Sequence, residues 1–412
     1  MTSTTIRAGA EQPESAYAWL RLAAAVAIGT IGNVGMWAVP VTLPAIQTDF
    51  GVDRAQASLP YTAVMLGFAV GGVVAGRLVD RFGILLPLIG AAVALCVGYI
   101  LSAAAPTLWA YALAQGVLVG GGAAVFFAPL MVDISHWFVR RRGIAVAVAA
   151  CGNYVAGTLW PTPFQHLIEV YGWRMTHVIV GVFCLVTILP VTLLLRRPAP
   201  HVSAAVAPSV RGAAPDLGIS LNALQVLLCI AGVACCVAMA MPQVHIVAYC
   251  GDLGYGVARG AEMLSLMLGF GIISRIASGF IADKIGGVGT LLIGSVLQGS
   301  ALVMYFFFDS LFSLYVISAL FGLFQGGIVP SYAIIVREYF PAKEAGTRVG
   351  LVIMATLFGM ALGGWMSGEI FDLTGSYRAA FANGIAFNIL NGIIALWLLL
   401  RPGRAGGRLA QA

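Results

Sequence analysis

The sequence is poor in charge. Asp, Glu, Lys and Arg make up 9% of its 412 residues, whereas soluble globular proteins carry roughly 25%. Hydrophobic residues make up 60%, and the mean hydropathy is +0.96. So few charges could not cover the surface of a soluble protein of this size. The composition therefore excludes an ordinary soluble enzyme, a nucleic-acid-binding domain and a disordered chain, and the net charge of +6 points to the cytoplasmic face of a lipid bilayer.

Motifs of enzymes and metal sites are also missing. The sequence contains neither HExxH nor GxSxG, and no ATP-binding Gly-Lys-Ser/Thr segment. Its seven cysteines form no CxxC pair, so we expect them to be small packing residues. We expect no metal, no cofactor and no nucleic-acid partner, and we do not expect an enzyme or an ATP-driven pump.

Charge-free apolar runs divide the chain into twelve predicted membrane helices. A transmembrane helix needs about 20 apolar residues, and an unpaired charge in lipid is costly. The longest run, 82–132, is too long for one helix and contains a turn signal at Ala105-Pro106-Thr107, so it counts as two. The predicted spans are 18–45, 55–78, 84–104, 108–136, 143–168, 175–195, 219–250, 260–282, 288–307, 311–337, 346–371 and 379–400.

The distribution of Lys and Arg predicts the orientation. With these spans, seventeen of these residues lie on the side of both termini and four on the other side. Because cytoplasmic loops collect positive charge, we expect both termini in the cytoplasm and the protein in the cell inner (plasma) membrane. The first 17 residues have no apolar core, so we do not expect a signal peptide.

The two halves of the chain repeat each other. The motif at 76–83 recurs at 279–286, with each matched position 203 residues further on. The repeat predicts a six-helix half at 1–200, a linker at 201–218 and a second six-helix half at 219–412. The matched motif residues are Gly76, Asp80, Arg81 and Gly83 in the first half, and Gly279, Asp283, Lys284 and Gly286 in the second.

This doubled G-x-x-x-D-R/K-x-G pattern resembles the signature of the major facilitator superfamily, and the resemblance covers essentially the whole chain. It implies an all-α integral membrane protein of twelve helices in two pseudo-symmetric bundles, which transports by alternating access. In that family the motif latches the cytoplasmic side in the outward-facing state, and we assign this role to the eight motif residues. We expect the Asp80 carboxylate to accept hydrogen bonds from a helix N-terminus, and Arg81 to pair with Asp133.

The segment Trp137 to Gly152 resembles the start of the fifth helix of monocarboxylate transporters. It reads aromatic-Phe-x-Arg-Arg-Arg and then continues with small residues. Ile144 and Ala147 depart from the leucine and glycine of that pattern, and oxalate/formate exchangers carry a similar element. The lysine that many animal members have in the first helix is missing here, so their proton mechanism does not transfer directly.

Arg275 is the one Lys or Arg that the predicted spans place inside the membrane. It lies eight residues before Asp283, about 12 Å along a helix axis. An intramembrane arginine is functional by default, and its planar guanidinium matches a carboxylate. The resemblance places a substrate-binding arginine in this helix, four residues before a glycine such as Gly279. Several relatives have an acid one turn earlier, where this chain has Gly271, so we expect an unpaired cation that binds a small organic monoanion.

His245 is a second candidate. It lies in the seventh span after Pro242, at the repeat position of Thr42, and it titrates near neutral pH. It could carry a coupled proton or donate a hydrogen bond to the carboxylate; the alternative is a packing histidine. Weaker substrate-binding candidates are polar or aromatic residues near the middle of their spans: Asn33, Phe127, Asn153, Tyr154, Gln325 and Tyr332.

The leading hypothesis is a monomeric monocarboxylate transporter driven by proton symport. A single cation favours a monoanion over a dianion, because oxalate exchangers use a second cation in the eleventh helix and the segment 350–359 has none. An organic anion exchanger is the alternative. A drug or metabolite exporter is a third possibility, although Arg275 would repel a cationic drug.

Overall fold

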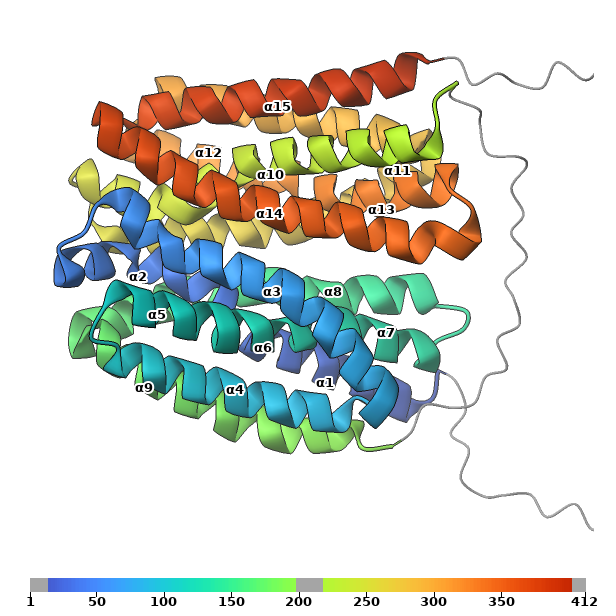
Figure 1. Cartoon of the computed structure of the whole chain (residues 1–412), viewed down its shortest axis with the longest axis horizontal. Helices are drawn as coiled ribbons and strands as arrows, with labels where there is room; N and C mark the ends of the chain where they lie inside the picture. Colours follow the sequence, from blue (N-terminus) through green and yellow to red (C-terminus); the bar gives the residue numbers. More distant parts are fainter. Residues whose placement is uncertain (1–13, 198–217, 402–412) are drawn as a thin grey trace, which may run out of the picture.

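The computed structural model describes residues 14–197 and 218–401, and these ranges are helical almost throughout (Figure 1). The first half contains α1 (Ala16–Gly32), α2 (Val34–Phe50), α3 (Arg54–Phe82), α4 (Leu85–Ala104), α5 (Leu108–Ala114), η1 (Gln115–Gly120), α6 (Gly121–Ala123), η2 (Ala124–Phe126), α7 (Ala128–Trp137), α8 (Arg142–Leu159), α9 (Pro161–Thr192) and η3 (Leu193–Leu195). The second half contains α10 (Leu221–Asp252), α11 (Val257–Phe307), α12 (Leu311–Gln325), α13 (Ile328–Tyr339), α14 (Ala342–Thr374) and α15 (Tyr377–Leu400).

The twelve predicted spans are confirmed in the described residues. Ten apolar helical segments there are long enough to cross a membrane. Two of them, Arg142–Leu195 and Val257–Phe307, have 54 and 51 residues, roughly twice the length that a bilayer requires. A non-helical glycine interrupts each one, Gly172 with φ +76° and Gly286 with φ +79°. Each long segment is therefore two spans, as the charge pattern predicted.

The two motif segments are helical up to their last residue, so the helices continue past the predicted span ends at 78 and 282. α3 continues through Asp80 and Arg81 to Phe82, and only Gly83, with φ +71°, leaves the helix. The second copy behaves in the same way, because α11 stays helical until Gly286. Only the final glycine of each motif needs the left-handed backbone region that side chains avoid.

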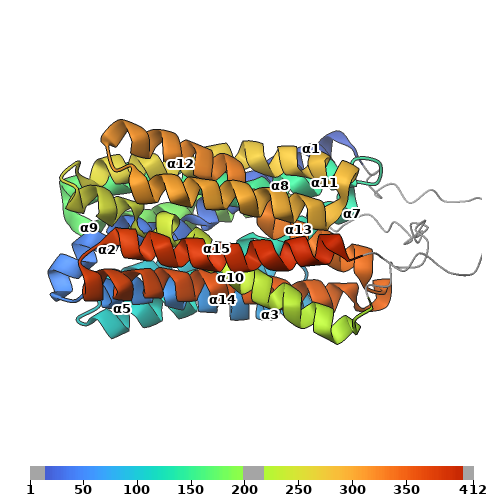
Figure 2. The same cartoon turned by 90° about the horizontal axis from the view of Figure 1, so that it is seen from above.

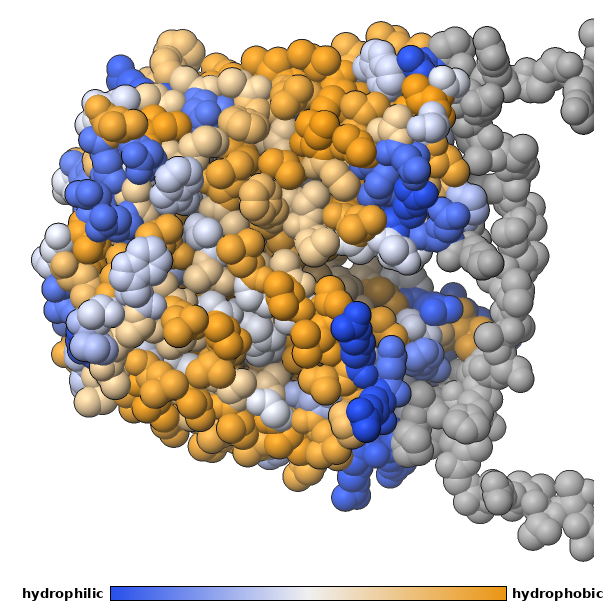
Figure 3. Space-filling model, in the orientation of Figure 1, coloured by the Kyte–Doolittle hydropathy of each residue, from blue (hydrophilic) through white to orange (hydrophobic). Residues whose placement is uncertain are grey.

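The helices form two bundles that lie side by side, α1–α9 in one and α10–α15 in the other (Figure 1), and most run along the long axis (Figure 2). The start of α1, the start of α10 and the end of α15 all lie at one end of the molecule, which we call the linker end (Figure 1). Figure 3 shows an apolar band around the middle and polar residues at both ends. The predicted linker 201–218 falls almost entirely outside the described residues.

The halves touch at the end away from the linker and separate at the linker end. A methyl group on Gly368 of α14 would lie 2.8 Å from Cα of Ala55 in α3, so these helices meet backbone to backbone. Nearer the linker end, a methyl group on Gly76 of α3 or Gly350 of α14 would meet nothing within 4 Å. Figure 3 shows the hollow between the halves at this end. The structure is therefore open at the linker end and closed at the opposite end.

Candidate functional site

Arg275 lies on α11, where the two halves begin to separate. Its side chain is half-buried, and its Nη1 donates a hydrogen bond of 3.3 Å to the carbonyl oxygen of Ala150 on α8. Its Cζ lies 4.9 Å from the ring centroid of Tyr154, one turn further along α8. Within the described residues Arg275 forms no ion pair. Its positive charge therefore faces a carbonyl and an aromatic ring, and no carboxylate of residues 14–197 or 218–401 pairs with it.

Gly271 and Tyr154 fit each other closely. A methyl group on Gly271 would lie 2.4 Å from Cε1 of Tyr154, which is shorter than real contacts of a Cβ atom. The ring of Tyr154 therefore fills the space beside Gly271, one helical turn before Arg275. The space that an acidic side chain at position 271 would need is filled here by the ring of a residue from the other half.

Asn153 lies beside this group. The indole nitrogen of Trp37 on α2 donates to both the backbone carbonyl and the side-chain Oδ1 of Asn153, each at 3.2 Å. Asn153 is half-buried. Of the weaker candidates, α8 thus brings Asn153 and Tyr154 to the neighbourhood of Arg275.

Phe127 and Asn33 lie at breaks in the helices of the first half. Phe127 separates η2 from α7, is half-buried, and packs against Phe68 with 6.1 Å between ring centroids. Asn33 ends α1 and is fully buried. Its Nδ2 donates to the carbonyl oxygen of Gly29 at 2.7 Å and of Phe126 at 3.4 Å. The side chain of Asn33 therefore stabilises the bend between α1 and α2.

Tyr332 and Gln325 lie inside the second half and are fully buried. The hydroxyl of Tyr332 donates to Oδ1 of Asn391 at 2.8 Å, and Oε1 of Gln325 accepts from Nε2 of Gln243 at 2.9 Å. No hydrogen bond in the described residues joins either side chain to Arg275. These two hydrogen bonds connect helices within one bundle, and Nε2 of Gln325 is buried without a hydrogen-bond partner in the described residues.

His245 is not beside Arg275. Residue 245 is seven positions before the end of α10, about 10 Å along the axis, whereas residue 275 is eighteen positions into α11, about 27 Å. The short connection between these helices places their ends at the same level, so the two side chains lie at different depths. His245 is fully buried; its Nε2 donates to the carbonyl oxygen of Gly364 at 2.7 Å, and its Nδ1 lies 3.3 Å from the hydroxyl of Tyr377.

Tyr377 connects His245 to a cluster that joins the two halves at the closed end. We call Arg54, Asp252, Asp372, Tyr377 and His245 the Arg54 clamp. Arg54, the first residue of α3, is buried although it is charged; its Nη1 donates to the Tyr377 hydroxyl at 2.6 Å, and its Nη2 lies 3.1 Å from Asp252.

The backbone of α3 also takes part in the clamp. The N–H groups of Arg54 and Ala55 donate to the carboxylate of Asp372 at 3.0 and 2.7 Å. The carboxylate thus satisfies donors that every helix start leaves free. Except for His245, sequence reasoning missed this cluster, because its four other residues fall at predicted span ends, where charges are ordinary.

Within the part of the chain that the structure describes, the exposed acids and bases of the doubled motif form no hydrogen bond or ion pair between the halves. The side chains of Asp80, Arg81, Asp283 and Lys284 are exposed at the linker end. In the described residues Asp80 accepts no hydrogen bond, contrary to our expectation of a helix N-terminus beside it. The surfaces that the motif would latch lie apart, so the latch role of the eight residues remains a prediction.

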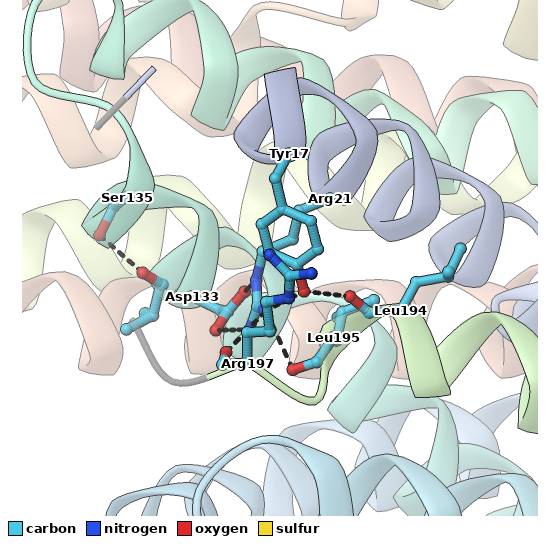
Figure 4. Close-up of polar contacts among 8 residues, drawn as sticks. Tyr17, Arg21, Asp133, Ser135, Leu194, Leu195 and Arg197 are labelled. Atoms are coloured by element: carbon cyan, nitrogen blue, oxygen red, sulfur yellow. Dashed lines mark hydrogen bonds and ion pairs between the residues drawn. The ribbon is translucent and has the colours of Figure 1, made fainter. Parts of the chain in front are cut away.

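Asp133 pairs with Arg21, and our expectation of an Arg81–Asp133 pair is wrong. Nε and Nη2 of Arg21 donate to the two carboxylate oxygens at 2.8 and 2.7 Å, in a bidentate arrangement (Figure 4). Nη1 of Arg21 donates to the carbonyl oxygens of Leu195 and Arg197 at 2.9 and 3.0 Å. The pair is buried and connects α1, α7 and the end of the first half. Arg21 is therefore the partner of the Asp133 carboxylate, which we had assigned to Arg81.

The loop before α8 binds the carboxylate of Glu14, which lies outside the membrane spans. The backbone N–H of Arg141 donates to the side chain of Glu14 at 2.8 Å, and this hydrogen bond lowers the pKa of the Glu14 carboxyl.

Two adjacent helical bundles with a doubled motif and a cleft between them agree with sequence comparison. The profile of the Major Facilitator Superfamily matches residues 25–311 and 288–412. The chain belongs to this family. It is a membrane transporter and not an enzyme.

Similar proteins extend over nearly the whole chain. Monocarboxylate transporter 13 of Bos taurus is 26% identical over 393 residues, covering 92% of this chain and 88% of that protein. Monocarboxylate transporter 12 of Homo sapiens is 24% identical and covers 90% and 78%. Among solved structures, a bacterial homologue of the human lysosomal transporter Spinster, in an inward-facing and unoccupied conformation, superimposes with a TM-score of 0.71 at 15% identity, covering 94% of this chain and 98% of that one. This last likeness shows the fold alone.

Proposed function

We propose that this transporter carries small organic monocarboxylates and that Arg275 binds their carboxylate. The observation that supports the proposal is a half-buried arginine between α11 and α8, held by a carbonyl and a ring without an ion-pair partner in the described residues. A cation in a poorly solvated site is stabilised by an anion, and a guanidinium can bind a carboxylate through two parallel hydrogen bonds. The similarity to monocarboxylate transporters points to the same substrate class.

We further propose that the linker end is cytoplasmic. In the described residues, four arginines lie at the opposite end, and most other Lys and Arg residues lie at the linker end, which is the asymmetry expected of a cytoplasmic face. The open cleft then faces the cytoplasm, and the structure represents an inward-facing state. Insertion of a protease site after residue 401 would test this orientation, because we expect cleavage only from the cytoplasmic side of the plasma membrane.

As the driving force we first propose proton symport, with His245 as the titrating residue. We also propose that the protein acts as a monomer. Because His245 belongs to the Arg54 clamp, a proton there would act on opening of the closed end and not directly on the bound carboxylate. The same separation favours anion exchange as the second candidate, since exchange needs no titrating group beside the substrate. Uptake into liposomes with and without a pH gradient separates the two, because only symport responds to the gradient when no counter-anion is inside.

A thermal-shift screen tests the substrate class. A ligand that binds only the folded state raises its melting temperature. We expect small monocarboxylates to raise Tm and their neutral amides, which have nearly the same shape, to leave it unchanged. Equal shifts with acids and amides would contradict carboxylate recognition, and dicarboxylates that outperform monocarboxylates would contradict the inference from a single cation.

A further inference from the structure

The contact between Tyr154 and Gly271 connects the two halves directly at Arg275. Tyr154 belongs to α8 of the first half, and Gly271 and Arg275 belong to α11 of the second. Positions 271 and 275 are one turn apart, and so are Ala150 and Tyr154. Each helix therefore presents two positions one turn apart to the other, and the guanidinium of Arg275 contacts both residues of α8.

The backbone of α11 cannot move away from Tyr154 to relieve this close contact. On its other side, a methyl group on Gly326 would lie 2.4 Å from the carbonyl oxygen of Gly271 and 3.1 Å from the backbone nitrogen of Arg275. The segment at 326–327 therefore packs directly against the α11 backbone. With α11 held between this segment and α8, the space for the Tyr154 ring exists only because residue 271 has no side chain.

The ring and the carbonyl fix the guanidinium without neutralising it. The ring of Tyr154 attracts the cation through its negative face, and the Ala150 carbonyl accepts one N–H. An arginine side chain has five N–H donors, and this is the one protein hydrogen bond that Arg275 donates within the described residues. The remaining donors are free to bind an anion in the cleft.

We propose that Tyr154 is a positioning residue for Arg275: its ring, seated against Gly271, holds the guanidinium so that its free N–H groups present to the substrate carboxylate. This inference rests on the proposed function of Arg275. In this role Tyr154 acts through its ring. Its hydroxyl is not needed and does not form a hydrogen bond to the substrate. It also means that both halves contribute to the site, so separation of α8 from α11 would disorder the arginine.

A set of four variants tests the proposal in the full-length purified protein, with a monocarboxylate that raises the Tm of the wild type as the probe. Tyr154→Phe keeps the ring and should bind within about twofold of wild type. Tyr154→Leu removes the cation–π contact and should weaken binding by about 3- to 30-fold, the range that such contacts span. Gly271→Ala should weaken binding similarly, because its methyl group displaces the ring.

The double variant Tyr154→Leu/Gly271→Ala decides whether these effects share one cause. If the ring is the reason that residue 271 must be glycine, the added methyl group should cost little once the ring is gone, and the double variant should bind about as well as Tyr154→Leu. The Tm of each ligand-free variant is measured in parallel. A purely structural role would lower Tm while leaving the dissociation constant unchanged.

The outcomes separate the two proposals. If the wild type binds the monocarboxylate, Tyr154→Leu binds it more weakly and Tyr154→Phe keeps the wild-type affinity, the positioning role is supported. Wild-type binding with unchanged affinity in Tyr154→Leu overturns it and leaves the role of Arg275 intact. Loss in Tyr154→Phe overturns it in favour of a hydroxyl that binds the substrate. If the wild type binds no monocarboxylate, both proposals fail.

Discussion

Replacing Arg54 should open the closed end of the transporter. Arg54 is the one charged side chain in the described residues that passes from the first half into a cluster of the second, where Tyr377, Asp252 and the ring of Phe371 surround it. Arg54→Ala removes all three contacts. The backbone N–H groups that donate to Asp372 remain, so the helix start stays capped and the variant should fold.

The size of the effect follows from these contacts. A buried hydrogen bond from a charged donor is worth about 1.5–3 kcal/mol. The ion pair contributes at most about 1 kcal/mol, because Asp252 is 37% exposed and solvent screens the pair. A partly buried cation–π contact adds roughly 1 kcal/mol. Since these terms overlap, we take about 3 kcal/mol in total, which corresponds to a shift of roughly 100-fold in the equilibrium between the closed and open ends.

Thiol labelling at Thr62→Cys measures this shift. The Thr62 hydroxyl donates to the carbonyl oxygen of Ala361 across the contact between α3 and α14 at 3.0 Å, so a membrane-impermeant reagent reaches this position only when the end opens. We expect labelling to accelerate at least tenfold in Arg54→Ala, with the parent protein, which has only its native cysteines, as the background. Arg174→Ala is the matched control, because Arg174 lies at the same end but pairs with Asp49 within its own half. Equal labelling rates in Arg54→Ala and Arg174→Ala would refute the clamp.

Three further predictions concern other parts of the molecule. Gly76→Leu should fold and bind substrate but not transport it, because its side chain has open space here and would block closure of the linker end; proteoliposome uptake at normal rates would contradict this. Asp133→Ala should lower the free energy of unfolding by about 3–5 kcal/mol, since it leaves Arg21 buried without its partner, whereas the exposed Asp80→Ala should have little effect; equal melting temperatures would show that the buried pair is unimportant. His245→Ala should abolish the pH dependence of uptake, and a retained pH profile would return His245 to a packing role.

The spans could be predicted from sequence because the cost of a charge in lipid is local and nearly independent of the fold. Some helices extend past their predicted spans, as α2 does, since polar residues such as Gln47 and Asp49 continue a helix once it leaves the membrane. The doubled motif was also readable. Its conformation was not, because glycines in a helix and glycines in a turn look alike in sequence until φ is known.

Contacts across the chain were not predictable in the same way. Arg21 and Asp133 are 112 positions apart, and the sequence offered Arg81 as an equally plausible partner. Tyr154 meets Gly271 only because α8 and α11 cross at that level. His245 appeared close to Arg275 because their helices are neighbours, yet antiparallel neighbours can place two residues at quite different depths. Arg275 itself could be identified from the sequence, because a single cation within an otherwise charge-free span stands out without knowledge of its contacts.

Direct measurement of carboxylate binding to Arg275→Lys tests the account most directly. Lysine keeps the positive charge but loses the planar fork that binds both carboxylate oxygens and stacks on Tyr154. The measurement is isothermal titration with a monocarboxylate identified by thermal shift. We expect Arg174→Lys to have the dissociation constant of the wild type. We expect Arg275→Lys to show no measurable binding although it still melts cooperatively. Wild-type affinity in Arg275→Lys would contradict the claim that this guanidinium recognises the substrate.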